Sequence, residues 1–271
     1  MYPILFQIGP VIIYSLWIFI TIGFFVALLI MLKLIKKNRL KLQFLADSSL
    51  AIFLGGIILS RLIFVIQNYQ TYLFPFNYNN VIQIFYIWDK GMSLWGGIIG
   101  CLGTLVYLAR KEKENALRWL DVFTVGITGG FVFGNIGTFL DGTNYGNETT
   151  LPWGVVMDNS IYAVPIHPVQ IYSAIYCLVI AIILYLLFSR NVGKKDGNIM
   201  LLGSGLYSLL YFCEGFLRGD ESNIFIGLRE EQIYALLIFL ISGILFYAKN
   251  FTNFNIHNLK HPNQTEDESS T

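Results

Sequence analysis

The chain has 271 residues, of which 55% are hydrophobic and 13% are charged, and its formal net charge is +1. A soluble domain carries roughly 25% charged residues, so this composition excludes an ordinary water-soluble protein. The near-neutral balance provides no basic surface, and we expect no nucleic-acid partner. The three cysteines lie in apolar stretches without metal-ligand spacing, so neither a metal site nor another cofactor is expected.

Seven apolar segments are long enough to cross a bilayer as helices, which takes about 17–25 residues. The first follows an N-terminus without charge and precedes a basic cluster, the reverse of the order in a cleaved secretion signal. We therefore expect an all-α polytopic membrane protein that retains its first helix. In chain order the predicted spans are residues 10–32, 44–66, 92–110, 119–139, 168–189, 198–217 and 231–248.

Basic residues predict the orientation of these spans. Cytoplasmic loops of membrane proteins carry an excess of Lys and Arg. Here most of the basic residues fall in alternate connections, which places the N-terminus outside and the C-terminus inside. They are Lys33, Lys36, Lys37, Arg39 and Lys41; Arg110, Lys111, Lys113 and Arg118; Arg190, Lys194 and Lys195; and Lys249 and Lys260.

Two long connections, residues 67–91 and 140–167, lie on the outer side in this topology. The second contains several Gly and Pro residues and neither Lys nor Arg, which predicts a shaped loop and not a helix. Residues 1–250 are expected to form a single transmembrane domain. Residues 251–271 are expected to form a disordered cytoplasmic tail, because residues 262–271 are polar and acidic.

Ionisable residues within or beside the spans are candidates for function, because a charge at the centre of a membrane helix costs about 2.5–3.5 kcal/mol. Arginines near the outer leaflet would suit a lipid phosphate, since guanidinium binds phosphate oxygens bidentately. Structural roles are the alternatives: a Glu214–Arg218 pair on one helix face, backbone carbonyls for Arg61, and a helix cap for His167. The candidates are Arg61, Asp141, His167, Glu214, Arg218 and Arg229.

Six segments carry a recognisable pattern. They are PILFQIGPVIIYSLW (3–17), LGGIILSRL (54–62), IWDKGMSLWGGIIG (87–100), IHPVQIY (166–172), CEGFLRGD (213–220) and GLREEQ (227–232). In this order they resemble elements of the prolipoprotein diacylglyceryl transferase family. The segment 166–172 is similar to the HPxQLY element of that family and is quite specific. The resemblance extends over about residues 2–248.

The family signature, G-R-x-G-N-F-x-N-x-E followed shortly by Y/W-G, aligns with GNIGTFLDGTNYG (134–146). In the family, the arginine of this signature is held to contact the lipid head group. Here Asn135 replaces the arginine, Thr138 and Asp141 replace the asparagines, and Thr143 replaces the glutamate. The residues retained from the signature are Gly134, Gly137, Phe139, Tyr145 and Gly146.

The resemblance implies transfer of a diacylglyceryl group from phosphatidylglycerol to the lipobox cysteine of prolipoproteins, in the plasma or inner membrane of a bacterium. The implied partners are phosphatidylglycerol, prolipoprotein signal peptides and membrane lipid. Arg218 and Arg61 are expected at the phosphate, with Arg229 in support. His167 is the candidate base because it is the only histidine on the outer side. Expected substrate-binding residues are Arg61, Asn135, Asp141, Tyr145, Gln170, Tyr172, Glu214 and Arg229.

Two other functions remain open at this point. A diverged member of the family could bind lipid in the same cavity without catalysis or for another purpose. A lipid transporter is the other candidate, but internal repeats and broken helices in matched halves, which many transporters contain, are not visible in the sequence.

Overall fold

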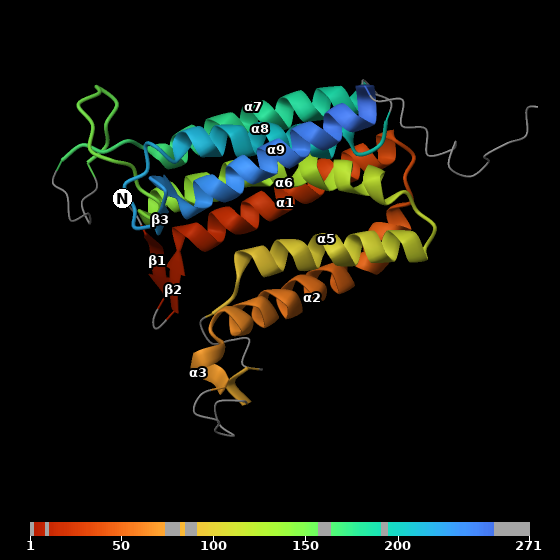
Figure 1. The fold of residues 1–271 in the computed structure, drawn as a ribbon, viewed down its shortest axis with the longest axis horizontal. Coiled ribbons are helices and arrows are strands. Elements are labelled where there is room, and N and C mark those ends of the chain that lie inside the picture. The colour runs from red at the N-terminus through yellow and green to blue at the C-terminus, as the bar shows by residue number, and fades with distance from the viewer. Residues whose placement is uncertain are drawn as a thin grey trace, which may run out of the picture.

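In the part of the chain that the structure describes, the long helices run roughly along the longest axis of the molecule (Figure 1). The computed structural model describes residues 3–8, 11–73, 82–84, 91–156, 164–190 and 195–251. The long helices are α1 (Ser15–Lys37), α2 (Leu42–Gln67), α5 (Leu94–Lys111), α6 (Ala116–Asp141), α7 (Val169–Ser189), α8 (Asn198–Glu214) and α9 (Glu230–Phe251); a short helix, α3 (Tyr69–Leu73), follows α2.

Each predicted span overlaps one long helix, so the prediction of a helical membrane protein is confirmed. By length and composition, α1, α2, α6, α7 and α9 could cross a membrane. Helices α5 and α8 are shorter, at 18 and 17 residues, and at about 1.5 Å per residue would extend over roughly 25 Å. The count of seven spans stays a prediction. The predicted tail lies beyond α9, outside the described residues, apart from Phe251 at the end of that helix.

The start of the first span was predicted wrongly. Helix α1 begins at Ser15, and the residues before it form strand β2 (Val11–Tyr14), which pairs antiparallel with strand β1 (Ile4–Ile8). Strand β2 consists of β-branched and aromatic residues, which favour an extended backbone. Their hydropathy alone could not distinguish this hairpin from the first turn of a membrane helix.

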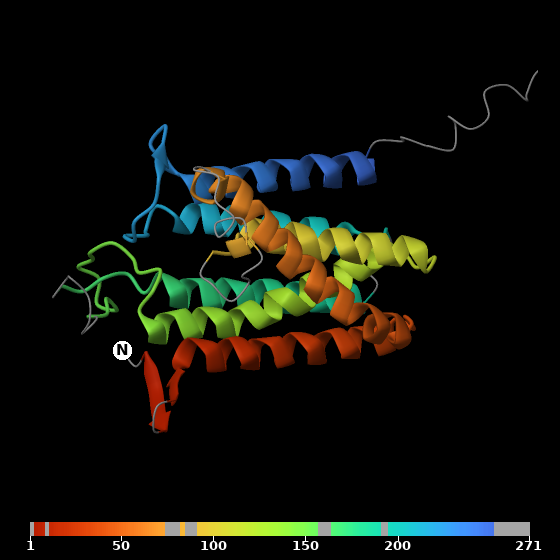
Figure 2. The ribbon, with the colours of Figure 1, turned by 90° about the horizontal axis from the view of Figure 1, so that it is seen from below.

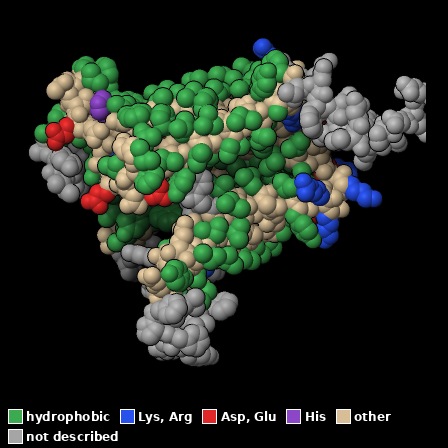
Figure 3. Space-filling model, viewed as in Figure 1, with side chains coloured by type: hydrophobic (Ala, Val, Ile, Leu, Met, Phe, Trp, Pro, Cys, Tyr) green, Lys and Arg blue, Asp and Glu red, His purple; other side chains and the backbone are tan. Residues whose placement is uncertain are grey.

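The outward-facing surface of the helices is apolar. Figure 3 shows hydrophobic side chains covering most of the visible face between its two ends. Leu50, for example, is 66% exposed and Phe24 is 64% exposed. Isolated apolar side chains are common on soluble proteins, but an apolar surface of this extent is expected where lipid is the solvent.

Two groups of helices make up the bundle. Helices α1, α6, α7, α8 and α9 pack together, and α2 and α5 form a separate pair (Figure 1). Close contact in the larger group depends on small residues: a Cβ atom on Gly23 of α1 would lie 2.6 Å from the carbonyl oxygen of Gly130 in α6. Small residues allow such close approach in membrane helix pairs.

The main hydrophobic core joins the two groups at one end of the bundle. Here the ring centroids of Phe44 in α2 and Trp119 in α6 lie 4.7 Å apart, and Leu34 and Leu105 are fully buried. Toward the opposite end the α2–α5 pair lies apart from α1 (Figure 1), and the surface is hollowed between the pair and the larger group (Figure 3). The described surface is therefore recessed between the two groups near the second end (Figure 3).

The predicted cytoplasmic loops meet at the end that holds the core. Arg118 donates to Asp196 at 2.7 Å and to Asn38 at 3.0 Å, which links three connections between helices. Lys195 donates to the carbonyl oxygen of Lys249 at 2.6 Å, which adds the end of α9. These contacts place the basic segments on one side, as the predicted orientation requires.

The orientation can be tested with fusions. A reporter that is active only in the cytoplasm should be active after Lys195 or Lys249 and inactive near Asn147, because the basic loops should stay inside. A reporter that is active only outside should give the opposite pattern. Strong cytoplasmic activity at Asn147 would contradict the seven-span topology.

Candidate functional site

A cavity of about 180 Å³ lies within the helical bundle, near the end opposite the basic loops. Every side chain in its wall is polar or ionisable, although the surrounding bundle is apolar. Helices α6, α7 and α8 contribute most of the wall, and the loops after α6 and α8 contribute one residue each. The lining residues are Asn135, Thr138, Asn144, Gln170, Ser173, Tyr207, Tyr211, Glu214 and Arg218.

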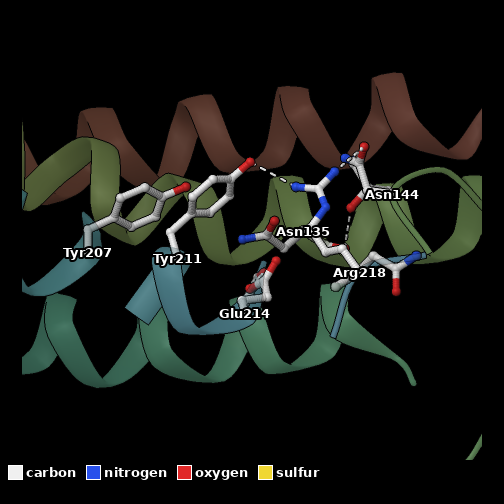
Figure 4. A pocket seen from close by; sticks show the side chains of 9 residues that line it. Asn135, Asn144, Tyr207, Tyr211, Glu214 and Arg218 are labelled. Carbon is white, nitrogen blue, oxygen red and sulfur yellow. Dashed lines mark hydrogen bonds between the residues drawn. The ribbon is translucent and has the colours of Figure 1, made fainter. Parts of the chain in front are cut away.

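Arg218 is the cationic residue of this wall, and its guanidinium is held on several sides. It forms a two-point ion pair with Asp220, at 3.0 Å from Nε and 2.7 Å from Nη2. It also donates to the Tyr211 hydroxyl at 2.8 Å and to the Asn144 side-chain oxygen at 3.2 Å (Figure 4). Such a fixed guanidinium presents charge with a defined geometry.

The environment keeps Arg218 charged. Burial by itself would lower the pKa of the guanidinium, but the hydrogen bonds to Asp220 and the nearby Tyr211, Asp220 and Glu214 raise that pKa overall. The side chain is 10% exposed. The pocket therefore contains a permanent positive charge in surroundings of low dielectric, where its interaction with an anion is strengthened.

Arg229 contacts Asp220, the partner of Arg218, and not the pocket itself. It donates to the Asp220 carboxylate at 3.1 Å and to the Asp220 carbonyl oxygen at 2.8 Å. Asp220 thus accepts from two arginines, and Arg229 does not line the pocket. The sequence placed Arg229 at the substrate; in the structure its contacts instead fix the residue that orients Arg218.

Glu214 is the acidic residue of the wall and is buried. It accepts a short hydrogen bond from the Ser173 hydroxyl in α7. The ion pair between Glu214 and Arg218, considered as an alternative from their spacing, is not formed: among the described residues Arg218 pairs with Asp220. Helix α8 ends at Glu214, so Arg218 lies beyond the helical face that this spacing assumed.

Asn135 and Gln170 also line the pocket, as expected. The Asn135 side-chain nitrogen lies 3.7 Å from the sulfur of Cys177, and Figure 4 shows the residue beside Glu214 and Arg218. Gln170 donates to the carbonyl oxygen of Thr143 at 2.7 Å. Its own amide oxygen is buried without a hydrogen-bond partner among the described residues. A buried acceptor of this kind in a pocket wall is the type of group that a bound ligand satisfies.

His167 and Tyr172 lie in a different cluster. The Nδ1 atom of His167 is 3.3 Å from the Tyr172 hydroxyl, which also accepts from Trp153 at 2.8 Å. None of the three lines the pocket. Helix α7 begins after Pro168 without a side-chain cap, so the alternative role of His167 as a helix cap is not formed either. The geometry thus separates the predicted base from the predicted phosphate site.

Asp141 and Tyr145 lie near the pocket but outside its wall. Asp141 is the last residue of α6, which ends at Gly142 with a φ of 83°. The carbonyl oxygen of Tyr145 accepts from the backbone of Gly219 at 2.9 Å, and Gly146 forms a bridge with Arg218. The retained Tyr-Gly of the signature therefore fastens the loop after α6 to the segment that carries Arg218.

The contacts of Arg61 are with other residues than those of the pocket. Its guanidinium donates to the carbonyl oxygens of Gln83 at 2.6 Å, Gly91 at 2.8 Å and Ile84 at 3.0 Å. The Phe64 ring lies 5.7 Å away. Arg61 does not line the pocket. The structure favours the alternative in which Arg61 satisfies backbone carbonyls, here in the connection after α2.

Arg61→Ala should therefore lower stability and not catalysis. Its loss leaves three carbonyl groups without this donor, at a cost of about 1–3 kcal/mol for each group that stays buried and unsatisfied. Thermal unfolding of the purified variant in detergent would measure the loss, and Arg61→Lys should be intermediate. If the variant keeps its stability but loses turnover, Arg61 is a substrate-binding residue.

Several wall residues were missed in the sequence, although helical spacing could have identified them. Thr138 lies three residues after Asn135 and Ser173 three after Gln170, which places each on the same helix face. Tyr207 and Tyr211 lie seven and three residues before Glu214, on the same face of α8. Asn144 in the wall and Asp220 outside it are loop residues, and no periodicity marks them.

Among the described residues, no group of three His, Cys, Asp or Glu residues could hold a metal ion.

Comparisons with known proteins identify the family of the chain. A family model described as prolipoprotein diacylglyceryl transferase matches residues 3–248. A phosphatidylglycerol–prolipoprotein diacylglyceryl transferase of Clostridium tetani is 28% identical over 257 residues, covering 93% of this chain and 99% of that protein. A protein of the same name from a Wolbachia of Culex pipiens is 29% identical, covering 95% of this chain and 98% of that protein. Another from Campylobacter curvus is 35% identical, covering 58% of this chain and 57% of that protein. With its membrane helices, its polar pocket and a match over nearly its whole length, the chain belongs to the prolipoprotein diacylglyceryl transferase family.

Proposed function

We propose that this protein transfers the diacylglyceryl group of phosphatidylglycerol to the lipobox cysteine of prolipoproteins. The thiolate sulfur of the acceptor attacks the glyceryl carbon that carries the phosphate ester. A carbon–sulfur bond forms, the carbon–oxygen bond breaks, and glycerol phosphate leaves with the electron pair. The observation that carries the proposal is a charged, fixed Arg218 in a polar pocket within the bundle of a member of this family.

Phosphate binding is assigned to Arg218 and its neutral neighbours. The guanidinium supplies charge-assisted hydrogen bonds to the phosphate, which gains charge as the ester bond breaks. Tyr211 accepts from Arg218 and keeps its own hydroxyl proton available. The side-chain amides of Asn135 and Asn144 are further donors in the wall. Neutral donors thus stand where other members have the signature arginine.

Glu214 is the better candidate for the base. A thiol must lose its proton to become an effective nucleophile. The Glu214 carboxylate lies in the pocket wall, fixed by Ser173, whereas His167 lies outside the wall beside Tyr172. A base has to reach the proton that it removes. We therefore assign proton transfer to Glu214, in place of the histidine suggested by the sequence.

The location follows from the same proposal. The protein would lie in the bacterial plasma or inner membrane with seven spans, its N-terminus outside and its C-terminus inside. The pocket would then face the outer leaflet, where the lipid donor and the membrane-anchored signal peptide can both reach it. Partners would be phosphatidylglycerol, prolipoprotein signal peptides and the surrounding lipid.

The test is a direct reconstitution. Purified protein in vesicles containing phosphatidylglycerol is incubated with a lipobox peptide, and mass spectrometry should detect one added diacylglyceryl group on the cysteine. A peptide with serine in place of that cysteine should not react. If the cysteine peptide also stays unmodified while a relative with the intact signature modifies it, the protein is a non-catalytic lipid-binding member.

Asn135→Arg should strengthen binding of phosphatidylglycerol. The change adds a second charge-assisted contact to the phosphate, which typically contributes about 1.5–3 kcal/mol. KM for phosphatidylglycerol should therefore fall roughly ten-fold or more. Asn135→Gln, which keeps a neutral amide, should leave KM nearly unchanged. A loss of turnover in the arginine variant would show instead that the pocket is rebuilt around a neutral residue.

A further inference from the structure

A small β-hairpin at the outer end of the bundle has an apolar tip that no part of the described chain covers. Strand β3 (Ile224–Phe225) pairs antiparallel with strand β4 (Leu228–Arg229). Ile224 is 74% exposed, Phe225 is 63% exposed and Ile226 is 85% exposed. Successive residues of a strand point to opposite faces, so this hairpin presents apolar side chains on both faces. A hairpin surrounded by water would have a polar face.

The backbone of the turn indicates that the apolar residue at the tip is maintained at a cost. Ile226 and Gly227, the two residues between the strands, have φ values of 53° and 75°. Positive φ at both central positions is the pattern of a type I′ turn, in which Asn-Gly is strongly preferred. Glycine adopts this conformation freely, but a β-branched residue there is an outlier. An Asn at 226 would relieve the strain, so the isoleucine serves something outside the hairpin.

The position of the hairpin points to lipid. Strand β4 runs directly into α9, which is long and apolar enough to cross a membrane. Figure 2 shows the hairpin projecting sideways from the bundle at the N-terminal end of α9, away from the other helices. Exposed apolar residues continue along α9 itself, such as Leu237 and Leu240. Charged residues occur at the base of the hairpin, at Arg229 and Glu230, and none occurs from Ser222 to Leu228.

We propose that the tip of this hairpin, residues 224–228, inserts into the outer leaflet at the boundary between head groups and acyl chains. Apolar side chains carried on a polar base are what hold peripheral elements at that depth. Burial of a side chain the size of isoleucine corresponds to a roughly ten- to hundred-fold preference for the apolar side. The strained turn is then offset by the lipid contact.

The same insertion would stabilise the pocket. Arg229, the last residue of the hairpin, donates to Asp220, and Asp220 holds the guanidinium of Arg218. A tip fixed in the leaflet restricts movement of the base of the hairpin and so of this chain of contacts. The hairpin is thus a positioning element, attached to the membrane at one end and to the pocket at the other.

Spin labelling in vesicles tests the insertion without any activity measurement. A nitroxide is attached to Ile226→Cys in a Cys213→Ser parent, and the unmodified parent gives the background from the other cysteines. The label should collide with oxygen more than with a water-soluble nickel chelate, as expected at Leu240→Cys in α9. A label at Thr150→Cys, in the exposed outer loop, should show the reverse. A label at 226 that behaves like the one at 150 would overturn the proposal.

Ile226→Asn separates lipid insertion from folding of the hairpin. Asparagine suits the turn better than isoleucine, so the hairpin itself should not be weakened. A label at Phe225→Cys should nevertheless move toward water when Ile226→Asn is added, and an unchanged label would contradict the proposal. Protection of the label only after a lipobox peptide is added would also overturn it, because the partner would then be the peptide.

Discussion

Replacing Arg218 with alanine should reduce transfer of the diacylglyceryl group to a lipobox peptide by about a hundred-fold or more. Arg218 is the cationic residue of the pocket wall, and its charge is fixed by Asp220, Tyr211 and Asn144. Its removal deprives the departing phosphate of the group that stabilises its developing charge. The measurement is the single-turnover rate in vesicles containing phosphatidylglycerol, with the folded fraction checked by thermal unfolding.

Two further variants make this result specific. Arg218→Lys keeps the charge but loses the planar fork, so it should recover only part of the rate. Arg118→Ala is the matched control, because Arg118 also forms a 2.7 Å pair with an aspartate, Asp196, but at the opposite end of the bundle. The control should transfer at nearly the normal rate. Full activity of Arg218→Ala would remove this residue from the site and leave it a structural role beside Asp220.

Much of the fold could be predicted because hydropathy responds to the solvent that surrounds each helix. A bilayer accepts only long apolar helices or closed barrels, so runs such as 169–189 have one plausible structure. The hairpins escaped prediction for the same reason. Strands β1 and β2 are as apolar as the helix that follows, and strands β3 and β4 have two residues each. Short apolar segments fit either structure.

The site could be predicted in part. Asn135, Gln170, Glu214 and Arg218 come from three separate regions of the chain, and the structure brings all four to one pocket wall. Glu214 and Arg218 could be selected because a charge in or beside a membrane helix is costly, whereas Asn135 and Gln170 were selected by the family resemblance. The sequence could not show which polar groups already have partners. Arg61 is costly in a membrane helix, and it is accounted for by three backbone carbonyl groups.

Local backbone geometry explains the other differences. The spacing of Glu214 and Arg218 predicts a pair only if the helix continues, but α8 ends at Glu214 and the chain turns. Arg218 therefore meets Asp220, two residues later, which no helical pattern would join to it. The sequence suggests His167 as the base by elimination among the histidines, a criterion that ignores where the side chain lies relative to the pocket. In the structure its ring is beside Tyr172.

Glu214→Gln should produce a loss comparable to that of Arg218→Ala. General bases contribute roughly a hundred- to ten-thousand-fold to a rate, and glutamine keeps the size of the side chain while it removes the acceptor of the proton. Ser173 can still donate to the amide oxygen, so the packing of α7 against α8 should persist. The expected result is a much lower rate of transfer at an unchanged thermal midpoint, measured with saturating phosphatidylglycerol.

His167→Gln is the matched comparison, since both changes replace a titratable group by a neutral amide. With Glu214 as the base, the histidine variant should lose only a small part of its rate, through weaker packing around Tyr172 and Trp153. A second readout separates proton transfer from structure: a peptide whose thiol is more acidic should react nearly as well with the Glu214→Gln variant as with the unaltered protein, because its thiolate forms without a base. If the histidine variant is instead the inactive one, and the acidic peptide rescues it, proton transfer belongs to His167, and the outer loop must close over the pocket during the reaction.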